Sequence, residues 1–272
     1  MRILKLLFSG IFIAAYLLAA LIGTLTIVNK RALRSFLIRS TSFFSNMLLT
    51  VLGITVVTLH SPLWEKDKPY LIVSNHLSYL DILAIASVTP SVFVSSMEGR
   101  AAAFLGLLAG CGGTLFVERR NKANLKREIA EITGTLKEGL NVVIFPEGTS
   151  SNGERVLPFK RSLMETAFLS KSDVLPVCLT YSYDEEKLSG PAKDSVYWYG
   201  DMTFFPHFFN LLKKTELIVT FRIMEPLRTG EYASRSALAG AAYQSISASY
   251  DWQKPCTRRD SMSDPMDLSF QS

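Results

Sequence analysis

The 272-residue chain is 48% hydrophobic and 19% charged, and its formal net charge is +5. This apolar content excludes an intrinsically disordered chain, and the length predicts one or two domains. The charge excess lies entirely in residues 1–60, which hold six basic and no acidic residues; the rest holds 23 basic and 24 acidic residues. Because the six cations flank apolar segments, they indicate a membrane surface as a partner and argue against nucleic acid.

Residues 6–28 form the first long apolar segment, 23 residues without a charge. As a helix this segment would be about 34 Å long, enough for a bilayer core of about 30 Å. A cleaved signal peptide is the competing interpretation, because Arg2 and Lys5 form a basic start. The length of the apolar run and the lack of a clear small-x-small cleavage site favour a retained anchor.

A second uncharged stretch, residues 40–64, is less apolar than the first. Together with the residues before it, this stretch carries an apolar stripe at helical spacing: Leu33, Phe36, Leu37, Phe44, Met47, Leu48 and Val51. An amphipathic helix in the membrane interface and a helix packed on the following domain fit this periodicity about equally. If only the first helix spans, the four charges between residues 30 and 39 place the rest of the chain in the cytoplasm. We therefore expect residues 1–60 to form a membrane-associated two-helix element.

After residue 69, short apolar runs alternate with longer amphipathic ones. They predict strands at 70–74, 92–95, 114–118, 141–145, 174–181, 196–199 and 217–223, and helices at 79–88, 98–109, 123–138, 161–169, 204–212 and 231–250. Gly139 is the expected stop of the helix before residue 141. This alternation predicts an α/β domain at residues 61–250, with a mostly parallel sheet flanked by helices. Residues 251–272 are polar and are expected to be a disordered tail.

The cysteines and histidines are few. Cys111, Cys178 and Cys256 are widely separated and fit neither a disulfide framework nor a Cys-x-x-Cys metal site. They are expected to be structural thiols in a reducing compartment. His60, His76 and His207 are the only candidates for imidazole chemistry. His207, within an aromatic run, has no carboxylate at motif spacing and is expected to be structural.

The segment at residues 74–81 contains a histidine followed five residues later by an aspartate, where a strand ends and a helix begins. An imidazole is the usual general base near neutral pH, and a carboxylate on its other nitrogen fixes the tautomer. The two side chains can meet only if His76 lies in the turn before the helix and Asp81 in its first turns, since five helical positions turn about 140°. A capping or loop role for His76 is the alternative.

The second chemistry-bearing segment is residues 145–153, Phe-Pro-Glu-Gly-Thr-Ser-Ser-Asn-Gly, which also follows a predicted strand. Open α/β sheets bind ligands beyond the carboxyl ends of their strands. The alternative interpretation is a turn-rich loop in which Glu147 is a solvated charge. A functional role requires this loop and the loop at His76 to converge.

Four segments now point to a family: Asn-His-x-x-x-x-Asp at 75–81, Gly-Thr-Leu-Phe-Val-Glu-Arg at 113–119, Phe-Pro-Glu-Gly-Thr at 145–149 and Val-Leu-Pro-Val at 174–177. Their order and spacing resemble the four motifs of the glycerolipid acyltransferases similar to 1-acyl-glycerol-3-phosphate acyltransferase. The resemblance covers roughly residues 60–225, and four ordered motifs are far more specific than one. The two N-terminal helices also resemble that family's membrane-docking element.

The resemblance implies a membrane-bound O-acyltransferase that moves a fatty acyl group from acyl-CoA or acyl carrier protein to a lysolipid hydroxyl. His76 would be the general base and Asp81 would orient it. The thioester already carries the activation, so neither a covalent acyl-enzyme nor a metal or other cofactor is required. Backbone amides at the start of the helix after His76 would stabilise the oxyanion.

The same resemblance implies the binding residues. Arg119 would hold the acceptor's phosphate, with Arg120 as a substitute. The third motif, Glu147, Gly148 and Thr149, would bind the acceptor, and Pro176 belongs to the fourth motif, which is associated with the acyl donor side and packing.

One departure from the family pattern concerns the acceptor. Members that form phosphatidic acid usually have an arginine directly after Phe-Pro-Glu-Gly-Thr, where this chain has Ser150. Loss of that cation weakens the case for 1-acyl-glycerol-3-phosphate and favours a lysophospholipid with a larger headgroup or a lyso-ornithine lipid. Lys160 matches a lysine often found after the third motif and would partly compensate; a solvated face at a helix start is its alternative role.

Other functions stay open at this point. A CoA-independent remodelling transacylase would use the same scaffold with another donor, and a noncatalytic membrane lipid-binding protein would not need both His76 and Asp81. The chain has no Gly-x-Ser-x-Gly elbow and no Gly-x-x-x-x-Gly-Lys loop, which disfavours a serine hydrolase and a nucleotide-dependent enzyme. The aromatic residues between 197 and 212 would either contact lipid, line an acyl tunnel or fill the core.

Overall fold

The computed structural model describes residues 2–118, 122–183, 186–188, 193–214 and 216–250. Arg119, Arg120, Cys256 and the tail at residues 251–272 lie outside this range. The helices are α1 (Arg2–Thr26), α2 (Lys30–Leu52), α3 (Leu80–Val88), α4 (Met97–Ala101), α5 (Ala103–Cys111), α6 (Lys122–Lys137), α7 (Glu165–Ser170), α9 (Phe204–Leu211) and α10 (Arg235–Ser249). Two short 3-10 helices are η1 (Ser162–Met164) and η2 (Thr229–Glu231).

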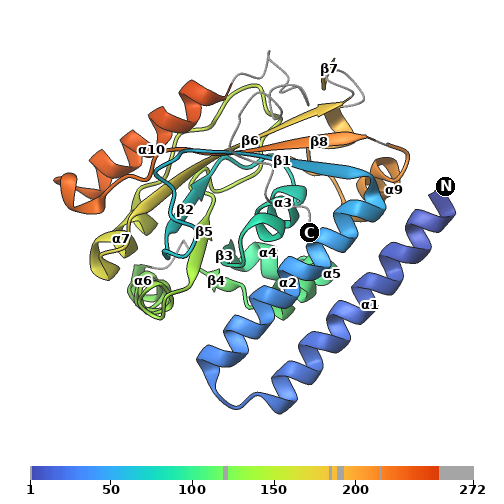
Figure 1. Ribbon diagram of the computed structural model, residues 1–272, viewed down its shortest axis with the longest axis horizontal. Coiled ribbons are helices and arrows are strands. Elements are labelled where there is room, and N and C mark those ends of the chain that lie inside the picture. The colour runs from blue at the N-terminus through green and yellow to red at the C-terminus, as the bar shows by residue number, and fades with distance from the viewer. Residues whose placement is uncertain (1, 119–121, 184–185, 189–192, 215, 251–272) are drawn as a thin grey trace.

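The strands form one mixed sheet (Figure 1). They are β1 (Ile54–His60), β2 (Leu71–Ser74), β3 (Ser91–Ser96), β4 (Leu115–Val117), β5 (Asn141–Ile144), β6 (Val174–Tyr183), β7 (Glu186–Lys187) and β8 (Leu217–Ile223). Their order is β1-β8-β6-β2-β5-β3-β4, with β7 paired to β6. The β6–β8 and β6–β7 pairs are antiparallel, and the other described pairs are parallel. The predicted mostly parallel α/β sheet flanked by helices is confirmed.

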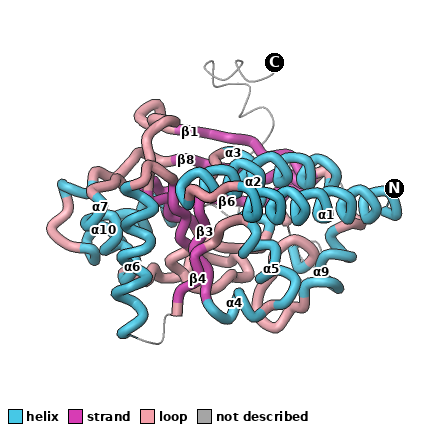
Figure 2. Tube along the Cα trace, turned by 90° about the horizontal axis from the view of Figure 1, so that it is seen from below, coloured by secondary structure: helices cyan, strands magenta, loops and turns pink. Residues whose placement is uncertain are grey.

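Helices cover both faces of this sheet. Figure 2 shows α6, α7 and α10 on one side and α2, α3, α4, α5 and α9 on the other, with α1 outermost. Strand β2 is buried along its whole length, as expected for a central strand with helices on both faces, because such strands are apolar on both sides. The chain leaves α6 at Gly139, whose φ is +84°, so the predicted helix stop is confirmed.

The structure corrects three boundaries. Residues 54–60, predicted to belong to the N-terminal element, form β1 and pair along their full length with β8, so the sheet begins at Ile54. The uncharged composition of residues 40–64 gave no sign that a helix ends and a strand begins there. The helix α2 ends at Gly53, whose φ is 75°. Residues 196–199 are not the predicted strand, because backbone hydrogen bonds to Lys193 close a turn there. The predicted helix at 98–109 is divided at Ala102 into α4 and α5.

Helix α1 has an unusual distribution of side chains. The residues that it buries are polar, small or aromatic with a hydroxyl group: Lys5, Ser9, Tyr16, Ala20 and Gly23. Its large aliphatic residues face outward, with Ile3 83% exposed and Leu25 76% exposed. Small inward residues allow close packing; a Cβ at Gly23 would lie 2.3 Å from the ring of Phe36. In water this arrangement would expose a large apolar surface, which soluble monomers avoid.

Helix α2 is held lengthwise against the domain. Near its start, Arg34 Nη1 donates to Thr135 Oγ1 (2.8 Å) and pairs with Glu138 (3.3 Å) on and just beyond α6. Further along, α2 packs on α3, and Asn46 donates to the carbonyl of Ser87. Both α1 and α2 are long and apolar enough to cross a bilayer, but the α1–α2 hairpin lies along one side of the domain (Figures 1 and 2).

Candidate active site

The carboxyl ends of three neighbouring parallel strands meet at one edge of the sheet. Strand β2 pairs with β5, and β5 pairs with β3, all in parallel. The loop after β2 carries His76, and the loop after β5 carries Phe145 to Ser150. The two loops converge, because the amide of Ser151 donates to the carbonyl of His76 (3.0 Å). The convergence on which a functional interpretation depends is therefore present.

His76 and Asp81 lie in hydrogen-bonding contact. His76 is in the turn before α3 and Asp81 in its first turn, and Nδ1 of His76 is 2.7 Å from Oδ2 of Asp81. The Asp81 side chain is fully buried and that of His76 is 18% exposed. Because a carboxylate accepts, Nδ1 carries the proton, and Nε2 is left as the nitrogen that can take one.

Three further donors hold the Asp81 carboxylate. Oδ2 accepts the amides of Leu77 (2.6 Å) and Ser78 (3.0 Å), and Oδ1 accepts the hydroxyl of Tyr181 (2.5 Å). Burial is the largest cause that raises the pKa of Tyr181 well above its ordinary value, so the phenol stays a donor. The amides of Leu77 and Ser78, in the turn before α3, thus bind Asp81 and are not free to bind an oxyanion.

Glu147 is buried and binds the backbone of two segments, at His76 and at Leu157. Its Oε1 accepts the amide of His76 (2.8 Å) and its Oε2 the amide of Leu157 (2.9 Å). The residue is 4% exposed, and burial raises its pKa to about 7. The Glu147 side chain is therefore neither a solvated charge nor part of the cavity lining. It binds the backbone amide of His76 instead.

Glu147 should give the stability of the fold a distinct pH dependence. The pKa of Glu147 in the folded protein, about 7, lies above the ordinary value of 4.5, so its contribution to the free energy of unfolding is fully present below about pH 4.5 and is lost as pH rises to about 7. We expect the free energy of unfolding of wild type, relative to Glu147→Gln, to fall across this window. Denaturant unfolding of both proteins from pH 4.5 to 8 measures it; a constant difference would contradict the prediction.

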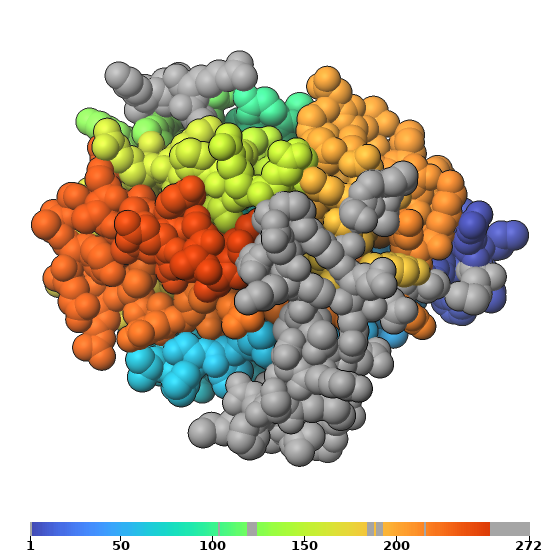
Figure 3. All heavy atoms as spheres, turned by 90° about the horizontal axis from the view of Figure 1, so that it is seen from above, coloured from blue at the N-terminus to red at the C-terminus, as the bar shows by residue number. Residues whose placement is uncertain are grey.

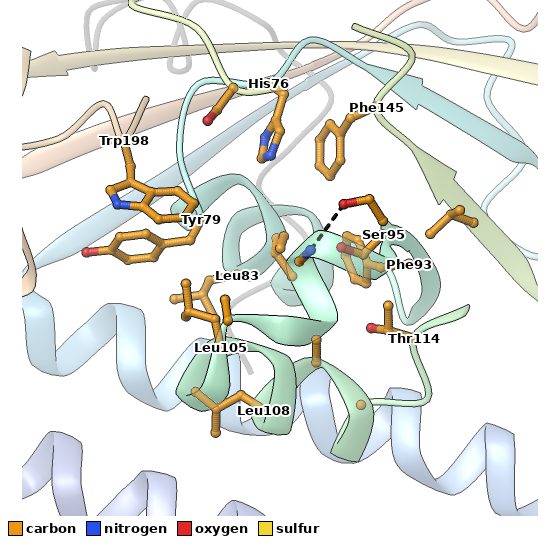
Figure 4. A pocket seen from close by; sticks show the side chains of 18 of the residues that line it. His76, Tyr79, Leu83, Phe93, Ser95, Leu105, Leu108, Thr114, Phe145 and Trp198 are labelled. Atoms are coloured by element: carbon orange, nitrogen blue, oxygen red, sulfur yellow. Dashed lines mark hydrogen bonds between the residues drawn. The ribbon is translucent and has the colours of Figure 1, made fainter. Parts of the chain in front are cut away.

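A cavity of about 940 Å³ opens beside His76, near the upper end of the range of about 300–1,000 Å³ typical of ligand sites. At one end it is lined by Gly148, Thr149, Ser150 and Lys160. The rest is largely apolar and runs between α1, α2, α3 and α5. Figure 4 shows the His76 ring beside Phe145 at this cavity, with Leu83, Leu105 and Leu108 further in. Phe145 stacks on His76 with 4.1 Å between ring centroids.

The predicted binding residues are thus only partly brought together. Gly148, Thr149, Ser150 and Lys160 line the cavity next to His76. Pro176 is buried inside β6, where its carbonyl accepts the amide of Met224, and it does not line the cavity. Arg119 lies outside the described residues. His207 is buried and bonded to Tyr79 and to the carbonyl of Tyr197, which agrees with its predicted structural role.

Two supporting residues were not predicted. Asn75 pairs with Leu179 through both of its side-chain groups, at 2.9 and 2.8 Å, and so continues the β2–β6 pairing beyond the end of β2. The position of Asn75 directly before His76 was the sequence feature that could have indicated this supporting role. Tyr181 is 100 positions from Asp81, and nothing in its local sequence indicated the contact.

Comparisons with known proteins identify the family of this chain. An acyltransferase family model matches residues 53–180. A lyso-ornithine lipid O-acyltransferase of Brucella abortus is 31% identical over 209 residues, covering 74% of this chain and 78% of the relative. A 1-acyl-sn-glycerol-3-phosphate acyltransferase of Neisseria meningitidis is 36% identical over 124 residues, covering 46% of this chain and 48% of the relative.

The fold has a solved counterpart. The crystal structure of the 1-acyl-sn-glycerophosphate acyltransferase PlsC from Thermotoga maritima aligns with a TM-score of 0.62 at 22% identity, over 92% of this chain and 96% of that one. The matched family model and the Brucella relative define an acyltransferase, and the solved structure shows that the two chains share a fold. The chain belongs to the 1-acyl-sn-glycerol-3-phosphate acyltransferase-like family, whose members acylate lysolipids.

Proposed function

We propose that this protein transfers a fatty acyl group from acyl-CoA or acyl carrier protein to the hydroxyl of a lyso-ornithine lipid at a membrane surface. The observation that carries the reaction is the His76–Asp81 pair at the mouth of a long apolar cavity. Nδ1 of His76 is engaged by Asp81, so Nε2 is the nitrogen available to the reacting hydroxyl.

In the proposed reaction, His76 Nε2 takes the proton as the acceptor oxygen attacks the thioester carbonyl carbon. A C–O bond forms, and the carbonyl electrons return as the C–S bond breaks. The thiolate leaves and receives the proton from His76, which gives an ester and a free thiol. The buried Asp81 carboxylate stabilises the imidazolium between these steps. The thioester supplies the activation, so this scheme needs no metal and no covalent acyl-enzyme.

Ser150 supports the choice of acceptor. It lines the cavity at the position where phosphatidic acid-forming relatives carry an arginine. An ornithine headgroup has one carboxylate and one ammonium group and lacks the phosphate monoester that an added cation would bind. The lyso-ornithine lipid acyltransferases also match over more of this chain, 74% for the Brucella protein against 46% for the Neisseria proteins.

The inverted surface of α1 supports membrane attachment. Its outward aliphatic side chains fit lipid, and its polar and small ones face the domain. Because α2 is held lengthwise on the domain, we propose that the α1–α2 hairpin lies in one leaflet as an interfacial anchor. The basic residues near its turn would then contact anionic headgroups, with the catalytic domain on the cytoplasmic side.

The acceptor is tested with purified protein, acyl-CoA or acyl carrier protein donors, and a panel of lysolipids analysed by mass spectrometry. We expect acylation of lyso-ornithine lipid to exceed that of 1-acyl-glycerol-3-phosphate, and we expect Ser150→Arg to shift the ratio toward the phosphate. Ser150→Ala is the matched control, since it removes the hydroxyl without adding charge. An acceptor profile that is unaltered by the arginine would count against the role of Ser150. Product formed without either thioester donor would instead indicate a transacylase.

A further inference from the structure

Helix α9, like α1, turns large apolar side chains outward. Phe205 and Phe209 are 54% and 48% exposed and lie one helical turn apart. The opposite side of the helix holds His207, Phe208 and Leu211, all buried. Lys213 follows two residues after the end of α9, and its ammonium group donates to the side chain of Asn210 (2.7 Å). An exposed aromatic stripe, here Phe205 and Phe209, with a lysine close to its end is typical of a segment at a membrane interface.

This stripe is continuous with the outward surface of α1. Lys5 of α1 donates to the carbonyl of Lys214, just after α9 (2.8 Å), and to that of Leu52 at the end of α2 (2.5 Å). One ammonium group therefore ties the end of α9 to the start of the hairpin. Figure 2 shows α9 beside the N-terminal part of α1, and Figure 3 shows the blue start of the chain against the orange segment.

Helix α5 fills the space next to α9. Its Phe104 lies 5.3 and 5.6 Å, between ring centroids, from Phe204 and Phe205, and its Leu107 is 53% exposed. Helices α1, α5 and α9 thus lie on one side of the molecule, away from α7 and α10 (Figure 2), and each carries exposed apolar side chains.

We infer that α9 is a further membrane-contacting element, whose Phe205 and Phe209 enter the lipid interface while Lys213 reaches anionic headgroups. This inference rests on the proposed attachment of the α1–α2 hairpin and extends it to a helix that begins about 150 residues after the hairpin ends. The occupant is the bilayer, because the stripe continues a surface whose apolar residues already face outward along all of α1, and its terminal cation complements acidic lipids.

The position of α9 would bring the active site to the bilayer. Phe204 and Phe208, on its other side, line the cavity together with Tyr79. His207 holds Tyr79 to α9, since its Nδ1 lies 3.0 Å from the Tyr79 hydroxyl and its Nε2 lies 3.0 Å from the carbonyl of Tyr197. A lysolipid chain could then pass from the leaflet to the cavity along α9 without crossing water.

The experiment places a photoreactive p-benzoylphenylalanine at one position at a time in the full chain. The positions are Phe209 on α9, Leu18 on α1 as the reference for hairpin attachment, and Leu169 on α7 as the control. Leu169 is matched to Phe209, because each is 48% exposed. Each protein is reconstituted into phosphatidylethanolamine–phosphatidylglycerol vesicles and irradiated, and adducts are identified by mass spectrometry. Retained acyltransferase activity verifies the fold.

We expect lipid adducts at Phe209 and Leu18 and several-fold fewer at Leu169. Adducts at Leu18 without adducts at Phe209 would overturn the role of α9 and leave the hairpin attachment intact. Lack of lipid adducts at both would overturn the membrane attachment as well. Crosslinks from Phe209 to a second copy of the chain, or equal lipid yields at Phe209 and Leu169, would also overturn the inference.

A kinetic measurement gives independent support. The double variant Phe205→Ser/Phe209→Ser should lower the rate on vesicle-embedded acceptor several-fold and leave the rate on a monomeric short-chain acceptor unchanged. Leu169→Ser should change neither. Equal losses of the double variant on both acceptors would point to damage of the cavity wall and contradict a membrane role for the stripe.

Discussion

Replacing His76 with alanine is expected to lower kcat by about 10²–10⁴-fold, the usual contribution of a positioned general base. The acceptor hydroxyl would then have to lose its proton without help. KM for both substrates should change little, because the cavity walls and the loop bonds formed by the backbone of His76 stay in place. Product formation from acyl-CoA, followed by mass spectrometry, measures the loss.

His60→Ala is the matched control for His76→Ala. His60 lies in β1, is exposed, and contacts Trp64 with 5.7 Å between ring centroids; it does not line the cavity. We expect wild-type activity in this variant. Unchanged acylation by His76→Ala, with a wild-type melting curve, would contradict the proposed mechanism.

Asp81→Asn is expected to have the second largest effect, a loss of kcat on the order of 10²-fold or more. An asparagine fits the site. Its side-chain oxygen can take the place of Asp81 Oδ2 next to His76, and its NH2 group the place of Oδ1 next to Tyr181. The negative charge is lost, so the imidazolium is no longer stabilised. Steady-state kinetics with acyl-CoA measures the loss of kcat.

Tyr181→Phe tests the same charge in the opposite direction. Removal of the hydroxyl takes one donor from Asp81 Oδ1, so less of the negative charge is compensated and the imidazolium is stabilised more strongly. The loss of kcat should therefore be much smaller than in Asp81→Asn. Steady-state kinetics of both variants, with melting curves to verify the fold, decides this; equal losses of kcat would contradict the role of the Asp81 charge.

Much of the fold and site could be predicted from local sequence. The strand–loop–helix context of His76 allowed the imidazole to meet Asp81, as it does in the structure, and the alternation of short and long apolar runs predicted the parallel sheet. These features depend on residues that are close together in the chain, so a short segment of sequence is enough to predict them. Local sequence did not reveal β1. This strand continues the uncharged composition of the last part of α2, and only its pairing with β8 distinguishes it.

The sequence by itself determined the class of fold, the motif residues and the concentration of cations in the first sixty residues. The tertiary structure decided how those parts are used. Glu147 is bound to the backbone of His76, and Tyr181 reaches Asp81 across 100 residues. Both α1 and α9 expose apolar side chains, and Lys5 of α1 donates to the carbonyl of Lys214 just after α9. Periodicity identifies an apolar face but not whether protein or lipid covers it, since that depends on contacts between segments far apart in the chain.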